Sequence, residues 1–137
     1  MSHTTVAPQP PAELVSFVER QIRSARLYTG VEHRSDKRRL MAMPVLVQPV
    51  DEQSNAVGVP FAAMTRDISP KGIGLVHTEP IEPGLLALRM SLEGKEVDLV
   101  AAVLWCRALG PFYYAGTNII RSGELPEVAL PDPSTPT

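Results

Sequence analysis

The sequence predicts a mainly β domain of six short antiparallel strands, preceded by one amphipathic helix. Two observations carry this prediction. From residue 40 onward, short apolar segments are separated by turn-forming residues, with no helical periodicity between them. Only residues 11–29 show apolar side chains that recur every three or four positions. Short strands without intervening helices favour an antiparallel sandwich or a small barrel, and the length of 137 residues suits one domain.

The helix is expected at residues 11–29, because Pro11 suits a first helical position and Gly30 a stop. Its apolar face consists of Leu14, Val18, Ile22 and Ala25, with Phe17 beside it. The segments at the two ends of the chain, 1–10 and 122–137, are rich in Pro, Ser and Thr and lack periodicity. We expect both to be disordered.

The six strands are expected where apolar segments lie between turn sequences. Their ranges are 40–50, 58–66, 72–78, 84–91, 96–107 and 112–120. The fifth is the clearest, because its apolar residues alternate and so share one face. That face contains Val97, Leu99, Ala101, Val103 and Trp105. Trp105 and Tyr113 are accordingly interpreted as core residues rather than as a platform for a ligand.

Positive charge is concentrated in one stretch of a chain whose net charge is -2. Residues 20–39 hold seven of the thirteen Lys and Arg but only two of the fifteen acidic residues. A local basic patch on an acidic body suits a specific anionic ligand better than long nucleic acid. An aromatic content of 5% also argues against one candidate function, that of a small barrel that binds RNA or DNA.

The sequence offers no support for metal binding, catalysis or membrane insertion. The three histidines, His3, His33 and His77, show no metal-ligand spacing, and Cys106 is the single cysteine. No Ser–His–acid or Cys–His set can be assembled, so we expect no enzyme activity and no metal. The apolar runs are eight residues long and no signal peptide is visible, so we expect a cytoplasmic protein.

The basic stretch "RSDKRR" at 34–39 places Arg34 and Arg38 four residues apart. Two guanidinium groups at this spacing can converge on one ligand. Each can pair with guanine O6 and N7, bind phosphate or stack on a base. Arg39 could be the second arginine of such a pair only if residue 35 were also an arginine. Residue 35 is a serine, so the pair is assigned to Arg34 and Arg38.

A second stretch, "DISPKG" at 67–72, offers complementary groups. Asp67 can accept two hydrogen bonds from the N1–H and N2 edge of guanine, and Ser69 can donate to phosphate or base. Gly72 permits a positive φ or a close backbone approach, and Lys71 adds a nearby positive charge. The alternative is a turn in which Asp67 or Ser69 hydrogen-bonds its own backbone, a role that can coexist with binding.

Arg34-x-x-x-Arg38, followed after 28 intervening residues by Asp67-x-Ser69-x-x-Gly72, resembles the two-part signature of PilZ domains. The stretch at 103–119 also resembles the closing strands of this family, with Gly116 at a recurrent glycine.

The resemblance implies a six-stranded antiparallel Greek-key β-barrel over 40–121, with a flexible arginine segment, 30–39, that folds over the ligand. Arg34 and Arg38 would bind guanine and phosphate. Asp67 and Ser69 would line the barrel side of the site, and Gly72 would shape the turn. Arg39, Lys71 and Gly116 are further candidates. Many members carry a helix after the last strand, for which the tail of this chain is too short and Pro-rich.

In function, the resemblance implies a bacterial receptor for the second messenger cyclic di-GMP. Such a receptor would change conformation on binding and signal to a partner protein whose identity the sequence does not reveal. The alternative is an adaptor that keeps the fold but acts by protein–protein contact without nucleotide.

Overall fold

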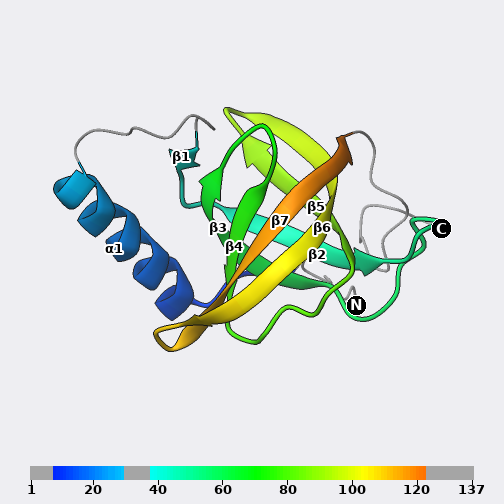
Figure 1. Cartoon of the computed structure of the whole chain (residues 1–137), viewed down its shortest axis with the longest axis horizontal. Helices are drawn as coiled ribbons and strands as arrows, with labels where there is room; N and C mark the ends of the chain where they lie inside the picture. The colour runs from blue at the N-terminus through cyan, green and yellow to red at the C-terminus, as the bar shows by residue number, and fades with distance from the viewer. Residues whose placement is uncertain (1–7, 30–37, 123–137) are drawn as a thin grey trace, which may run out of the picture.

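The computed structural model describes residues 8–29 and 38–122 and consists of one helix beside a β-barrel (Figure 1). The elements are α1 (Ala12–Thr29), β1 (Arg39–Leu40), β2 (Pro44–Val50), β3 (Phe61–Ile68), β4 (Ile73–His77), β5 (Leu85–Leu92), β6 (Lys95–Leu109) and β7 (Phe112–Ser122). Arg34, most of the arginine segment and most of both terminal segments lie outside the described residues, so the expectations placed on them remain predictions.

Six of the strands close into an antiparallel barrel. The ring runs β3-β2-β5-β6-β7-β4, and β4 pairs again with β3 to complete it. After the hairpins β2–β3–β4, the chain returns so that β5 lies beside β2, which is the Greek-key connection. The predicted fold class, a six-stranded antiparallel barrel with an N-terminal helix, is therefore confirmed.

The first predicted strand, 40–50, is in fact divided into β1 and β2. At the break, the register with β3 shifts by one residue between Leu40 and Pro44, and the Thr65 hydroxyl binds main-chain groups there. It donates to the carbonyl of Met41 and accepts from the amide of Met43, at 2.5 and 3.1 Å. Pro44, which has no N–H to offer, begins β2 directly afterwards. The barrel therefore carries one extra short strand, β1, paired with β3.

The main core fills the inside of the barrel with aliphatic side chains from every strand of the ring. Its buried members are Val45, Val47, Ala63, Ile73, Leu75, Ile81, Leu86, Leu88, Met90, Ala101 and Ala115. Most come from alternate positions of their strands, as the two-residue period of a strand requires. Because this interior is filled by side chains, the barrel is a packed scaffold, and candidate sites lie on its outside.

A second apolar cluster joins helix α1 to the outer face of the barrel. The helix contributes Leu14, Val18 and Ile22, as its periodicity predicts, and the barrel contributes Met64, Val76 and Tyr114. Figure 1 shows the N-terminal end of α1 beside the tip of the β6–β7 hairpin. There Phe17 packs edge-on against Phe112, with ring centroids 5.0 Å apart. The helix thus covers the outer face of β3, β4 and β7.

Candidate polar site on the outer face of the barrel

A β-bulge in β3 turns Asp67 to the outside of the barrel. The register between β3 and β4 shifts between Thr65 and Asp67, so Arg66 is an extra residue on β3. Without the shift, Asp67 would occupy an inward position. With it, Asp67 pairs with Gly74 on the outer face, and Ile68 returns to the core. Bulges of this kind often re-aim a side chain beside a functional site.

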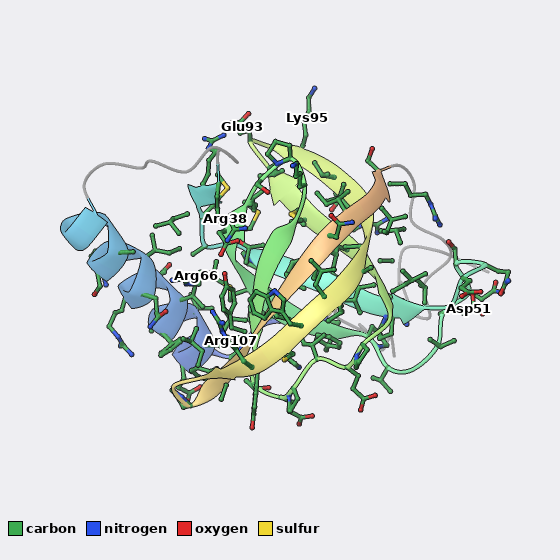
Figure 2. All side chains as sticks on the ribbon, viewed as in Figure 1. Arg38, Asp51, Arg66, Glu93, Lys95 and Arg107 are labelled. Carbon is green, nitrogen blue, oxygen red and sulfur yellow. The ribbon has the colours of Figure 1, made fainter. Side chains whose placement is uncertain are left out.

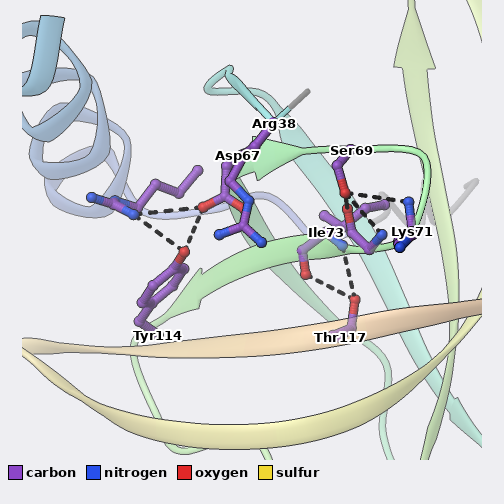
Figure 3. A network of polar contacts seen from close by, with 9 residues as sticks. Arg38, Asp67, Ser69, Lys71, Ile73, Tyr114 and Thr117 are labelled. Atoms are coloured by element: carbon purple, nitrogen blue, oxygen red, sulfur yellow. Dashed lines mark hydrogen bonds and ion pairs between the residues drawn. The ribbon is translucent and has the colours of Figure 1, made fainter. Parts of the chain in front are cut away.

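Asp67 is only 3% exposed, and three side chains contact its carboxylate (Figure 3). The Tyr114 hydroxyl donates a 2.5 Å hydrogen bond to Oδ2. Arg66 Nη1 lies 3.5 Å from the same oxygen and also donates to the Tyr114 hydroxyl at 3.2 Å. Arg38 Nε lies 3.7 Å from Oδ1. A carboxylate taken out of water needs partners of this kind, because an unpaired buried charge is costly.

Gly74 makes the meeting of Asp67 and Tyr114 possible. A Cβ at this position would lie 2.7 Å from Asp67 Oδ2 and 2.7 Å from Tyr114 Cε1. Real Cβ atoms do not come this close to their neighbours, so a larger residue would push the two side chains apart.

The protonated Tyr114 hydroxyl is favoured by its surroundings. Burial is the largest cause that raises the pKa of Tyr114 above its ordinary value of 10.0, and the hydrogen bond to Asp67 and the Asp67 charge add to it. Arg66 acts in the opposite direction. The guanidinium carbon of Arg66 lies 5.0 Å from the centre of the Tyr114 ring. The phenol therefore remains a hydrogen-bond donor to the carboxylate at neutral pH.

Ser69 has a structural role at the turn between β3 and β4 (Figure 3). Its Oγ accepts from the amides of Lys71 and Gly72, both at 3.2 Å, as in the alternative turn interpretation. Asp67 does not take part in such a turn. It lies within β3, paired with Gly74 and Leu40. Lys71 is exposed at the turn, and its carbonyl accepts from the amide of Ile119 at 2.7 Å.

Gly72 is required by a close backbone approach. A Cβ there would overlap the carbonyl oxygen of Thr117 on β7. Its φ lies outside the left-handed region that favours glycine, so of the two reasons given for a glycine the close approach applies. The Thr117 hydroxyl reinforces the same contact, since it donates to the Ile73 carbonyl at 2.8 Å. The hairpin that carries Asp67 and Ser69 is thereby fixed to β7.

A second bulge turns Trp105 outward, so its interpretation as a core residue is wrong. Val103 pairs with Thr117 but Trp105 pairs with Gly116, which leaves Leu104 as the extra residue on β6. Cys106 consequently takes the inward position, and Trp105 is 41% exposed. A Cβ on Gly116 would lie 2.5 Å from the indole, so the bare glycine accommodates the ring.

These residues lie in one row across four strands of the outer face. Asp67 pairs with Gly74, Gly74 with Gly116, and Gly116 with Trp105. The Arg107 guanidinium lies over the Trp105 ring at 4.7 Å and 5.8 Å from the centre of the Tyr114 ring. Figure 2 shows Arg38, Arg66 and Arg107 on the side of the barrel that faces α1. The row thus combines a carboxylate, several guanidinium groups and an exposed indole.

The structure brings together some of the predicted site residues and not others. Arg38 and Asp67, from the two parts of the motif, are in contact. Ser69 and Gly72 are at the adjacent turn, and Arg39 is exposed on β1. Sequence reasoning missed three residues of the network, Arg66, Tyr114 and Arg107. Their only signal is position, since Arg66 precedes Asp67 and Tyr114 lies two residues before Gly116.

Within residues 8–29 and 38–122, no three His, Cys, Asp or Glu side chains converge as they would around a metal ion. In the same part of the chain, no helix is both long and apolar enough to cross a membrane.

Comparison with known proteins gives one finding. The family model described as "PilZ domain" matches residues 32–121, well over half of the chain. No curated protein sequence matches this chain.

Proposed function

The chain belongs to the PilZ domain family, and on this basis we propose that it is a non-enzymatic bacterial receptor for cyclic di-GMP. The observation that supports the proposal most strongly is the contact between the two parts of the motif. Arg38 Nε lies 3.7 Å from Asp67 Oδ1, although the two residues are far apart in the sequence. A guanidinium beside a buried carboxylate is held in one orientation and is ready for a further anion or base.

In the proposed complex, Arg38 acts with Arg34 on guanine and phosphate. Asp67 accepts from the donor edge of guanine through Oδ1, because Oδ2 is already engaged by Tyr114. Ser69 and Gly72 contribute through the turn, with Lys71 and Arg39 as nearby positive charges. The exposed Trp105 indole above Gly116 offers a flat face on which a base can stack.

The proposed output is a change of conformation that a partner protein reads. Helix α1 packs on β3 and β4, directly beside Asp67 and Tyr114. A ligand that engages Arg38 and Asp67 alters the contacts next to this helix. Ligand binding then favours one arrangement of the helix to the extent that its affinity differs between the arrangements.

One observation favours a second candidate, an adaptor that works without nucleotide. Asp67 is buried and paired with side chains of the same chain, and the Ser69 hydroxyl is engaged in the turn. Both groups can therefore be explained as parts of the fold.

Calorimetric titration of the full chain with cyclic di-GMP distinguishes the two candidates. Saturable binding that is at least about tenfold weaker in Arg38→Ala but unaltered in Arg20→Ala supports the receptor, since Arg20 is exposed on α1 and matches the removed charge. Trp105 is the single tryptophan, so its fluorescence gives an independent signal. Absence of binding to the unaltered chain favours the adaptor.

A further inference from the structure

We propose that Tyr114 is the positioning residue of this site: its hydroxyl orients the Asp67 carboxylate, and its ring ties that carboxylate to helix α1. The inference rests on the proposed function and deepens it, because it assigns a role to a residue outside both parts of the motif.

The first support is that the two oxygens of the Asp67 carboxylate have different partners. The hydroxyl occupies Oδ2 at 2.5 Å, and Oδ1 remains on the side of Arg38. A carboxylate at the end of a short side chain can rotate. A hydrogen bond to one of its oxygens sets which direction the other one faces. Tyr114 therefore sets the orientation in which the Asp67 carboxylate faces Arg38 and a ligand.

The second support is that Tyr114 itself has little freedom. Its side chain is buried, and its ring belongs to the cluster with Leu14, Val18 and Ile22 of α1. Trp105 contacts the ring edge-on at 5.2 Å, and Arg66 and Arg107 lie over it. A ring fixed on several sides transfers its position to the group that its hydroxyl holds. A shift of α1 would likewise reach Asp67 through this ring.

The adjacent Tyr113 is a matched control within the same strand. Successive residues of a strand point to opposite faces, so Tyr113 lies on the face of β7 away from Asp67, in register with His77 and Ala108. It is partly buried and has the same chemistry. Tyr113→Phe thus removes a hydroxyl from the same strand without touching the proposed link.

The link can be tested first without any ligand. Ionisation of the three tyrosines of the full chain is followed by the ultraviolet absorbance of phenolate, and Tyr114→Phe identifies the Tyr114 step. Among the residues that the structure describes, the charged groups that face this phenol are Asp67, Arg66 and Arg107. Asp67→Asn removes the negative charge, so the Tyr114 step is expected at lower pH. A step that stays at the same pH in Asp67→Asn overturns the inference.

The second test measures cyclic di-GMP affinity. Tyr114→Phe keeps the ring and the helix packing but loses the bond to a charged acceptor, and we expect about tenfold weaker binding. Tyr113→Phe should bind like the unaltered chain. In an Asp67→Asn background, Tyr114→Phe should cause little further loss, since it acts through Asp67. Unaltered affinity of Tyr114→Phe, or an equal loss in both backgrounds, contradicts the inference.

The two tests separate the inference from the proposed function. If the unaltered chain does not bind cyclic di-GMP, the proposed function is wrong, and the tyrosine titration alone decides whether Tyr114 orients Asp67.

Discussion

At the scale of single residues, the Asp67 carboxylate organises its neighbours. One negative charge meets Arg38, Arg66 and the Tyr114 hydroxyl, and it is almost fully excluded from solvent. Because attraction between charges increases as water is removed, each partner is held more firmly here than on an open surface. The arginines thus keep a defined position although their side chains are long.

Arg38→Ala is expected to weaken cyclic di-GMP binding by about 1.5–3 kcal/mol, the range for a hydrogen bond to a charged group. Arg34→Ala should do likewise if both arginines grip the ligand. Arg38→Lys should fall between, because lysine keeps the charge but not the planar pair of donors. Calorimetric titration measures all three. Asp67 retains Arg66 and Tyr114 in these variants, so thermal unfolding should change little.

Asp67→Asn is expected to reduce both affinity and selectivity. Adenine lacks the N1–H and N2 donors that the carboxylate would accept, so cyclic di-AMP should bind the unaltered chain more weakly than cyclic di-GMP. The dissociation constant for cyclic di-AMP divided by that for cyclic di-GMP should therefore be smaller in the variant than in the unaltered chain. Equal affinities in the unaltered chain would show that Asp67 does not read the base.

His77 should make stability depend on pH in the mildly acidic range. Its ring stacks on Phe61 with centroids 4.3 Å apart, and burial lowers the pKa of His77 from 6.5, an effect that Glu79 partly offsets. The unfolded chain therefore binds a proton below pH 6.5 more readily than the folded one. This contribution to stability is complete above that pH and decreases below it. Urea unfolding should show a smaller loss on acidification for His77→Phe than for the unaltered chain.

At the scale of the elements, two bulges and three glycines shape the outer face. The bulge at Arg66 turns Asp67 outward, and the bulge at Leu104 does the same for Trp105. Between them, Gly74 and Gly116 leave space that the neighbouring side chains occupy, and Gly72 leaves space for the Thr117 carbonyl. A regular barrel with the same sequence of strands would instead direct Asp67 and Trp105 into the core.

Alanine at the three glycines should destabilise the fold to different degrees. In Gly72→Ala the new Cβ meets the main chain of Thr117, which cannot move aside, so a loss of about 3 kcal/mol is expected. Gly74→Ala meets the tips of Asp67 and Tyr114 and should cost about 1–3 kcal/mol. Gly116→Ala meets the half-exposed Trp105, which can shift, and should cost about 1 kcal/mol or less. Denaturant unfolding measures this order, and a larger loss at Gly116 than at Gly72 contradicts it.

Periodicity predicts regular elements but not their interruptions. Leu14, Val18 and Ile22 repeat at helical spacing, and the structure buries all three. The alternation from Val97 to Trp105 continues without a break in the sequence, and no local signal marks Leu104 as an extra residue. The bulge depends on how β6 meets β7 across the barrel, which is information that local sequence does not contain.

The candidate site shows the same limit. Arg38 and Asp67 could be paired from the sequence only because their spacing resembles a known signature. Tyr114 reaches Asp67 through the register of β4 with both β3 and β7, and that register appears only in the folded chain.

At the scale of the whole molecule, the packed interior of the barrel and the outer face under α1 have different roles. The packed interior holds the strands together, while α1 rests on the outer face through a smaller cluster that includes Tyr114. Elements held by few buried contacts open and shift more readily than a central core. The helix is thus the part of the described structure best placed to respond to events at Asp67.

Cyclic di-GMP is therefore expected to change the amide hydrogen exchange of α1, above all along the buried face from Leu14 to Ile22. The β5 strand is the internal control, because it pairs with β2 and β6 and has no pairing with the strands that carry Asp67, Gly74 and Tyr114. Its exchange should stay the same. In Tyr114→Phe, ligand binding should affect α1 less at equal saturation, since the connection between carboxylate and ring is lost. If saturating ligand leaves exchange in α1 unaltered, the protein binds the nucleotide without transmitting it through this helix, and the partner must read the ligand-covered face itself.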